Sequence, residues 1–143
     1  MAALISAEEL EQLYIPNKSV ELVRGHLVVR EPSGFLHATV AARLICHLSA
    51  YAEQHDLGVV TASEGGFKIF SNPDTVLAPD AAYIAKSRLP KDTSSFPRVA
   101  PDIVAEVLSP RDRTGEAAEK VNDWLAAGSQ LVWVIDPVAR NAT

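Results

Sequence analysis

The chain has 143 residues, of which 48% are hydrophobic and 22% are charged, and its formal net charge is −5. This composition excludes an intrinsically disordered chain and a polybasic nucleic-acid-binding protein, and the length predicts a single domain with a substantial core. The only cysteine, Cys46, excludes an internal disulfide and a cysteine-based zinc site, which is consistent with a cytoplasmic location. We expect neither a signal peptide nor a membrane span, which would need roughly 20 consecutive apolar residues.

The first third of the chain predicts a short helix, a hairpin and a long helix. Ser6 and Glu9 have capping-box spacing, so a helix begins after Ser6 and is expected to reach about residue 14. Two β-like runs, 20–23 and 27–29, predict the hairpin. Apolar residues with a helical period then predict a helix over about 36–55.

Strands and loops alternate through the middle of the chain. Residues 59–62 and 67–70 predict two strands, and residues 75–84 predict a third that is interrupted by Pro79. Residues 86–100 are polar and contain prolines, so they predict a surface loop.

The last third predicts a βαβ unit. A strand over 102–108 precedes a helix over about 114–127 that ends at Gly128, and the apolar run 131–135 predicts a buried strand. The two strands of such a unit are parallel, with a right-handed crossover. The whole order predicts one α/β (α+β) domain, a mixed β-sheet flanked by helices.

Two acids lie among apolar residues in this pattern. Glu106 lies mid-strand with apolar residues on both faces, and Asp80 is expected in the strand 75–84 on the same face as Val76 and Ile84. A buried carboxylate is costly unless a metal, a cation or a hydrogen-bond donor lies beside it. Two acids on adjacent strands both stay ionised only with a cation between them. Oxygen ligands favour Mg²⁺ (or Mn²⁺).

Lys120 is the third member of this predicted site. It lies early in the helix that follows Glu106 and flanks the apolar face that contains Trp124. Its stem can lie on apolar surface while the ammonium reaches a polar site. Two acids and a lysine suit metal-assisted hydrolysis of a phosphodiester, in which the lysine adds positive charge near the scissile phosphate.

These motifs resemble a known family. Residues 78–80 (Ala-Pro-Asp), 101–110, Lys120 and 126–137 are similar to the bacterial family described as "putative restriction endonuclease", of the PD-(D/E)XK nuclease superfamily. Residues 21–29 and His37 resemble its opening, so the resemblance covers about 20–137. It implies a restriction-endonuclease-like fold and a Mg²⁺-dependent DNA endonuclease.

The resemblance also implies a role for each residue. Asp80 and Glu106 match the two metal-binding acids, and Lys120 replaces the lysine that usually follows the second acid by two residues, where this chain has Leu108. Glu21 matches an early acid that assists the site, and His37 would be auxiliary. Family members usually continue past residue 137 with another strand and helix, so the domain expected over 1–143 lacks those elements.

Simpler interpretations stay open for these residues. Glu21 can pair with Arg24 or Arg30 on the hairpin, and His37 can be a hydrogen-bonded core residue. The chain as a whole can be a catalytically inactive nuclease-fold module that binds nucleic acid or a protein. It can also be a homodimer subunit whose acids are salt-bridged to Lys120.

DNA contact would come from local basic side chains, because the net charge is negative. The candidates are Arg111 and Arg113 after the strand, and Lys86, Arg88 and Lys91 in the 86–100 loop. Asp102, at the start of the strand that holds Glu106, is interpreted as a structural acid.

Overall fold

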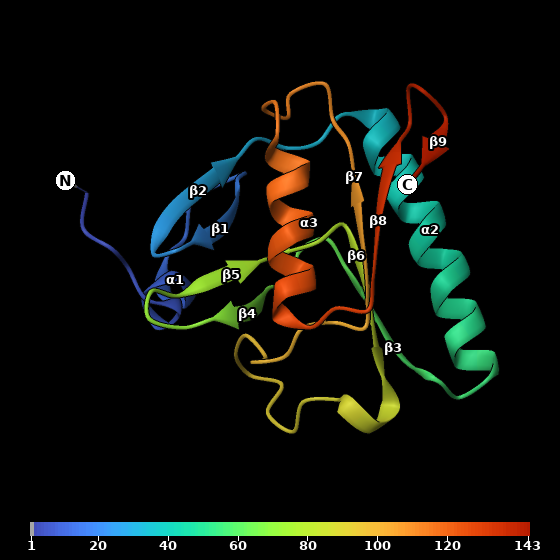
Figure 1. Ribbon diagram of the computed structural model, residues 1–143, viewed down its shortest axis with the longest axis horizontal. Helices are drawn as coiled ribbons and strands as arrows, with labels where there is room; N and C mark the ends of the chain where they lie inside the picture. The colour runs from blue at the N-terminus through green and yellow to red at the C-terminus, as the bar shows by residue number, and fades with distance from the viewer. Residues whose placement is uncertain (1) are drawn as a thin grey trace.

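The computed structural model describes residues 2–143, which form two β-sheets and three α-helices (Figure 1). The elements in chain order are α1 (Ala7–Gln12), β1 (Ser19–Val23), β2 (His26–Arg30), α2 (Phe35–Gln54), β3 (Gly58–Ala62), β4 (Phe67–Phe70), β5 (Thr75–Leu77), β6 (Ala81–Ala85), the 3₁₀ turn η1 (Lys86–Arg88), β7 (Ile103–Val107), α3 (Glu116–Ala127), β8 (Leu131–Asp136) and β9 (Asn141–Ala142). We call the sheet of order β2-β1-β5-β4 the hairpin sheet, and the sheet of order β3-β6-β7-β8-β9 the central sheet.

The central sheet is built around β7. Strands β7 and β8 are parallel, with Glu106 opposite Val134, and α3 makes the crossover between them. The other pairings of this sheet are antiparallel, so the predicted βαβ unit and the mixed sheet are confirmed. Helices α2 and α3 lie on opposite faces of the sheet (Figure 1), so β7 is covered on both sides, as its two apolar faces require.

The prediction of one strand over 75–84 is wrong. Strand β5 pairs with β1 and β4 in the hairpin sheet, whereas β6 pairs with β3 and β7 in the central sheet. Pro79 lies between them and has no backbone N–H, so it cannot continue a ladder. Asp80 therefore lies where the chain crosses from one sheet to the other, immediately before β6, and not on a strand face.

Local end signals place the helices within a few residues of the prediction. Ser6 accepts from the N–H of Glu9, whose carboxylate accepts from the N–H of Ser6, and α1 ends at Gln12. Helix α3 begins at Glu116, two residues later than predicted, because Gly115 precedes it with φ of 83°. It ends at Gly128, whose φ of 113° favours glycine.

The core lies mainly between α3 and the central sheet. Trp124 is fully buried and packs edge-on against Phe67, with ring centroids 6.3 Å apart, next to Leu77, Ile84 and Val104. A smaller cluster of Ala7, Leu10, Leu22 and Val76 attaches α1 to the hairpin sheet. Within residues 2–143, no helix has both the length and the apolar character needed to cross a membrane.

Candidate functional site

Five elements or connections bring the predicted site residues together. Glu21 comes from β1, His37 from the first turn of α2, Asp80 from the connection before β6, Glu106 from β7 and Lys120 from α3. Side-chain contacts join them into two groups: Glu21, Lys120 and Glu106 form one, and Asp80 and His37 form the other. Val107 links the groups because its N–H donates to Asp80 and it follows Glu106 on β7.

Lys120 bridges two carboxylates. Its Nζ lies 3.0 Å from Glu21 Oε1 and 3.5 Å from Glu106 Oε2. Burial lowers the pKa of Lys120, but the Glu106 and Glu21 carboxylates outweigh burial and raise it above its ordinary value. The ammonium is therefore charged at neutral pH and is shared by acids of both sheets. Asp80 is not among its partners.

Glu106 is held by α3 at both carboxylate oxygens. Trp124 Nε1 donates to Oε1 at 2.9 Å, and Lys120 Nζ approaches Oε2. The residue is only 7% exposed. Burial raises the pKa of Glu106 to about 7, Lys120 and Trp124 act against burial, and Asp80 raises the pKa further. Glu106 therefore changes charge near neutral pH, unlike an ordinary glutamate.

Asp80 and His37 form the second group. Asp80 Oδ2 accepts the N–H of Val107 at 2.7 Å and lies 3.3 Å from His37 Nε2. The hydrogen bond to Asp80 is the largest influence on His37 and raises its pKa, against the effect of burial. The other ring nitrogen, His37 Nδ1, is buried and has no hydrogen-bond partner.

Glu21 is tied to its own sheet as well as to Lys120. Its Oε1 accepts the N–H of Ala78 at 2.9 Å, and its Oε2 accepts from Arg30 Nε at 2.8 Å. Arg30 also pairs with Glu116, in the first turn of α3. Of the two sequence interpretations of Glu21, pairing with Arg30 is confirmed, and the contact with Lys120 exists beside it.

Sequence reasoning missed the supporting roles of Glu116 and Trp124, and it paired Arg30 with Glu21 without connecting Arg30 to α3. A signal was present, because Glu116, Lys120 and Trp124 follow each other at intervals of four and therefore share one face of a helix. That spacing places a carboxylate, an ammonium and an indole N–H in a row along α3. The row meets Arg30, Glu21 and Glu106 in turn.

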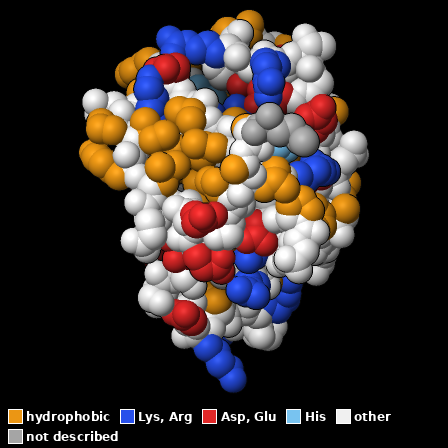
Figure 2. All heavy atoms as spheres, turned by 90° about the vertical axis from the view of Figure 1, so that its left-hand side faces the viewer, with side chains coloured by type: hydrophobic (Ala, Val, Ile, Leu, Met, Phe, Trp, Pro, Cys, Tyr) orange, Lys and Arg blue, Asp and Glu red, His pale blue; other side chains and the backbone are white. Residues whose placement is uncertain are grey.

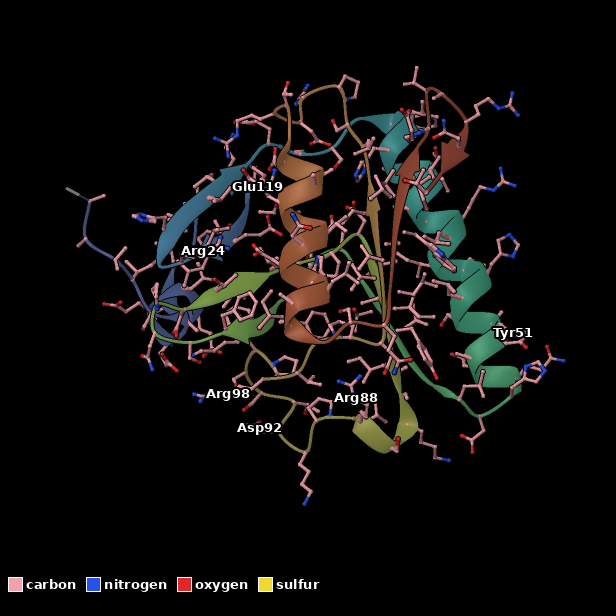
Figure 3. All side chains as sticks on the ribbon, in the orientation of Figure 1. Arg24, Tyr51, Arg88, Asp92, Arg98 and Glu119 are labelled. Carbon is pink, nitrogen blue, oxygen red and sulfur yellow. The ribbon has the colours of Figure 1, made fainter. Side chains whose placement is uncertain are left out.

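The basic residues of the 86–100 loop lie away from this site. Arg88 donates to Asp102 Oδ1 and to the carbonyl of Ala100, so it holds the beginning of β7. Glu106 lies four residues farther along, roughly 13 Å in an extended strand. Figure 3 shows Arg88 and Arg98 beyond the C-terminal end of α3, far from Glu119. Arg111 and Arg113 follow the end of β7 that holds Glu106.

The acids of the site have the ligand type that a hard metal ion prefers. Within residues 2–143, no group of three or more His, Cys, Asp or Glu side chains is arranged to hold a metal. Mg²⁺ needs only one or two protein carboxylates, because it retains several waters. Asp80 Oδ1 accepts no hydrogen bond from any described residue. Asp80 and Glu106 thus fit Mg²⁺ or Mn²⁺ in ligand type, with Lys120 as a competitor for Glu106.

Comparisons with known proteins identify the family and the fold of the chain. The model of the Uma2 family, described as "Putative restriction endonuclease", matches residues 7–143. A crystal structure of a putative nuclease belonging to DUF820 from Anabaena variabilis is similar, with a TM-score of 0.78 and 20% sequence identity. The match covers 94% of this chain and 75% of that one, and at this identity it shows the fold alone. None of the curated proteins searched matches the chain.

Proposed function

Because this chain belongs to the Uma2 family, described as "Putative restriction endonuclease", we propose that it is a Mg²⁺- or Mn²⁺-dependent DNA endonuclease. One observation carries the proposal: Glu106, a buried carboxylate, lies beside Lys120 and one residue before Val107, whose N–H holds Asp80. Two acids and a lysine at the end of a central strand supply the charges that phosphodiester hydrolysis needs.

Each residue has a role in this proposal. Asp80 and Glu106 hold the metal, which when bound lowers the pKa of a water and offsets charge on the phosphate. Lys120 places a positive charge next to the scissile phosphate. Trp124 orients Glu106, and His37 orients Asp80, through the contacts described above. Glu21 and Arg30 keep the Lys120 side chain on the sheet side of α3.

A second candidate is a nuclease-fold module without catalysis. It is favoured by the ion pair between Lys120 and Glu106, in which the ammonium competes with a metal for the carboxylate. In this case Lys120 serves only to neutralise buried acids. The separate interpretation as a homodimer subunit has the acids Asp80 and Glu106 salt-bridged to Lys120, whereas Lys120 bonds to Glu21 and Glu106.

The direct test is cleavage of plasmid and oligonucleotide DNA with Mg²⁺ or Mn²⁺. We expect Asp80→Asn, Glu106→Gln and Lys120→Met each to lower the cleavage rate by about 100-fold or more, since each removes a charge at the reacting centre. Asp92→Asn is the matched control, because Asp92 is an exposed acid in the 86–100 loop (Figure 3). Full cleavage by both acid variants would reject the nuclease assignment.

Metal titration separates the two candidates. We expect the wild type to bind Mn²⁺ in calorimetry, and the Asp80→Asn and Glu106→Gln variants to lose that binding while Asp92→Asn retains it. A wild type that binds DNA but no divalent ion would favour the non-catalytic module.

A further inference from the structure

A small apolar pocket adjoins the candidate site. It has a volume of about 240 Å³ and lies between the start of α2, the segment after β7 and the turn that follows β8. Phe35, Leu36, Pro110 and Val138 supply its apolar wall. Figure 1 shows the start of α2 next to the β8–β9 turn. The volume is below the roughly 300–1,000 Å³ of sites for drug-sized ligands, so the pocket suits one flat group.

His37 joins the pocket to the site. The residue lines the pocket, and its Nε2 lies 3.3 Å from Asp80 Oδ2. A group bound in the pocket is therefore one side chain away from a proposed metal ligand. The ring thus connects the pocket to Asp80 by its position, while its unpartnered Nδ1 is buried within the protein.

Phe35 gives the pocket an exposed aromatic rim. Its side chain is 87% exposed, although it is the first residue of a helix whose third residue reaches the site. Leu36 and Val138 beside it are also exposed. Unpaired nucleic-acid bases stack on exposed aromatic rings of this kind, and the apolar pocket lies next to the Phe35 ring.

The distribution of charge argues against tight binding of intact duplex DNA, because few basic side chains in residues 2–143 are unpaired. Eight of the 13 Lys and Arg side chains lie within 4.0 Å of an acid. Figure 2 shows red and blue side chains interleaved, without a continuous basic surface, on the face that carries α1 and β2. At the pocket, Arg111 lines the rim, and its described side-chain contact is to the carbonyl of Pro32 at 3.4 Å. One or two cations can hold a phosphate, but sliding along a duplex takes several.

We propose that this pocket receives one unpaired base, so that the substrate is single-stranded or locally unpaired DNA rather than intact duplex, an inference that rests on the proposed nuclease function for its choice of DNA. The base stacks on Phe35 in the pocket beside His37, and Arg111 contacts a neighbouring phosphate. The strand is thereby held with its backbone beside Asp80.

Binding in EDTA tests this proposal separately from catalysis. Fluorescence anisotropy would compare a labelled single-stranded oligodeoxynucleotide with a blunt duplex of the same sequence. We expect the wild type to bind the single strand more tightly. Phe35→Ala should weaken that binding about 10-fold, as loss of one stacked base does, and Phe35→Trp should restore it. Tyr51→Ala is the matched control, because Tyr51 is exposed on the same helix at its other end (Figure 3).

A 2-aminopurine base in the single strand gives an independent readout. Its emission should change on binding to the wild type and to Tyr51→Ala, and this change should disappear with Phe35→Ala. Equal affinities of the Phe35→Ala and Tyr51→Ala variants, or tighter binding of the duplex, would overturn the proposal. If single-strand binding depends on Phe35 but the protein cleaves no DNA, the proposed base-binding pocket stands and the proposed nuclease activity is rejected. If the protein cleaves DNA but its binding does not depend on Phe35, only the base-binding pocket is rejected.

Discussion

Glu106 has neighbours that make its protonation differ from that of an exposed glutamate. Burial is the largest influence and raises its pKa to about 7, while Lys120 and the Trp124 N–H favour the charged form. A carboxylate of ordinary pKa is almost fully ionised at neutral pH, so small changes of pH there do not alter its charge. Glu106 instead gains or loses a proton within the range in which most enzymes work.

This pKa predicts a pH dependence of stability in the metal-free protein. Between the ordinary pKa of 4.5 and about 7, the folded state holds a proton on Glu106 that the unfolded state has released. The free energy of unfolding therefore falls as pH rises through this window, by about 3 kcal/mol in total, and Glu106 adds no further change above it. Urea denaturation in EDTA at pH 4.5 to 8 measures the fall.

The control for this prediction is Glu106→Gln, which has no proton to lose. His37 also has a raised pKa, so its contribution falls in the same direction, but only as pH rises through the pKa of His37 in the folded protein. The difference between the wild-type and Glu106→Gln curves removes the contribution of His37. Parallel curves for the two proteins would show that Glu106 titrates as an ordinary glutamate.

Helix α3 holds the two sheets together at the site. Its Glu116 and Asp123 pair with Arg30 and Arg24 of the hairpin, and its Lys120 reaches acids of both sheets. Trp124 attaches the same helix to the core and donates to Glu106. One face of one helix therefore provides both the packing and the hydrogen bonds that fix the buried acid.

We predict that Trp124→Phe lowers the free energy of unfolding by about 1–3 kcal/mol, because the aromatic ring remains but Glu106 loses its buried donor. Trp133→Phe is the matched control, since the Trp133 side chain on β8 makes no described hydrogen bond and is only half-buried. Urea denaturation followed by circular dichroism measures both variants at pH 8, where Glu106 is mostly ionised. Equal effects of the two substitutions would assign the loss to packing alone.

The whole molecule is acidic, and its free cations near the site are few. Arg111 and Arg113 follow the end of β7, and their side chains form no ion pair within residues 2–143, whereas Arg24, Arg30 and Lys120 are paired. A protein that neutralises two phosphates releases few counterions when it binds a single strand. Its affinity for DNA should therefore depend only weakly on salt.

We predict a slope of log K against log salt of between about −1 and −2 for single-stranded DNA, from roughly 0.7 per neutralised phosphate. Arg111→Ala should make the slope shallower by about 0.7, whereas Arg43→Ala, on the exposed side of α2, should leave it unchanged. Anisotropy titrations at several salt concentrations measure the slope. A slope steeper than about −5 would mean that a broad surface holds the DNA.

The sequence by itself determined most of the elements and pointed to the five residues of the candidate site. Capping pairs, terminal glycines and the period of apolar residues act within a few positions, so α1, α2, α3 and the βαβ unit were predictable. The catalytic roles of Asp80, Glu106, Lys120, Glu21 and His37 rest on residue chemistry and family resemblance, and they remain predictions.

Only the tertiary structure decided which groups meet. Residues on either side of Pro79 join different sheets, because strand pairing depends on partners far along the chain. Lys120 bonds to Glu21, which lies 99 positions away in the sequence. Asp80 contacts His37 and not Lys120. The pKa of Glu106 and the pocket beside His37 arise from the same packing. Burial and contact depend on the whole fold, so local sequence patterns do not specify them.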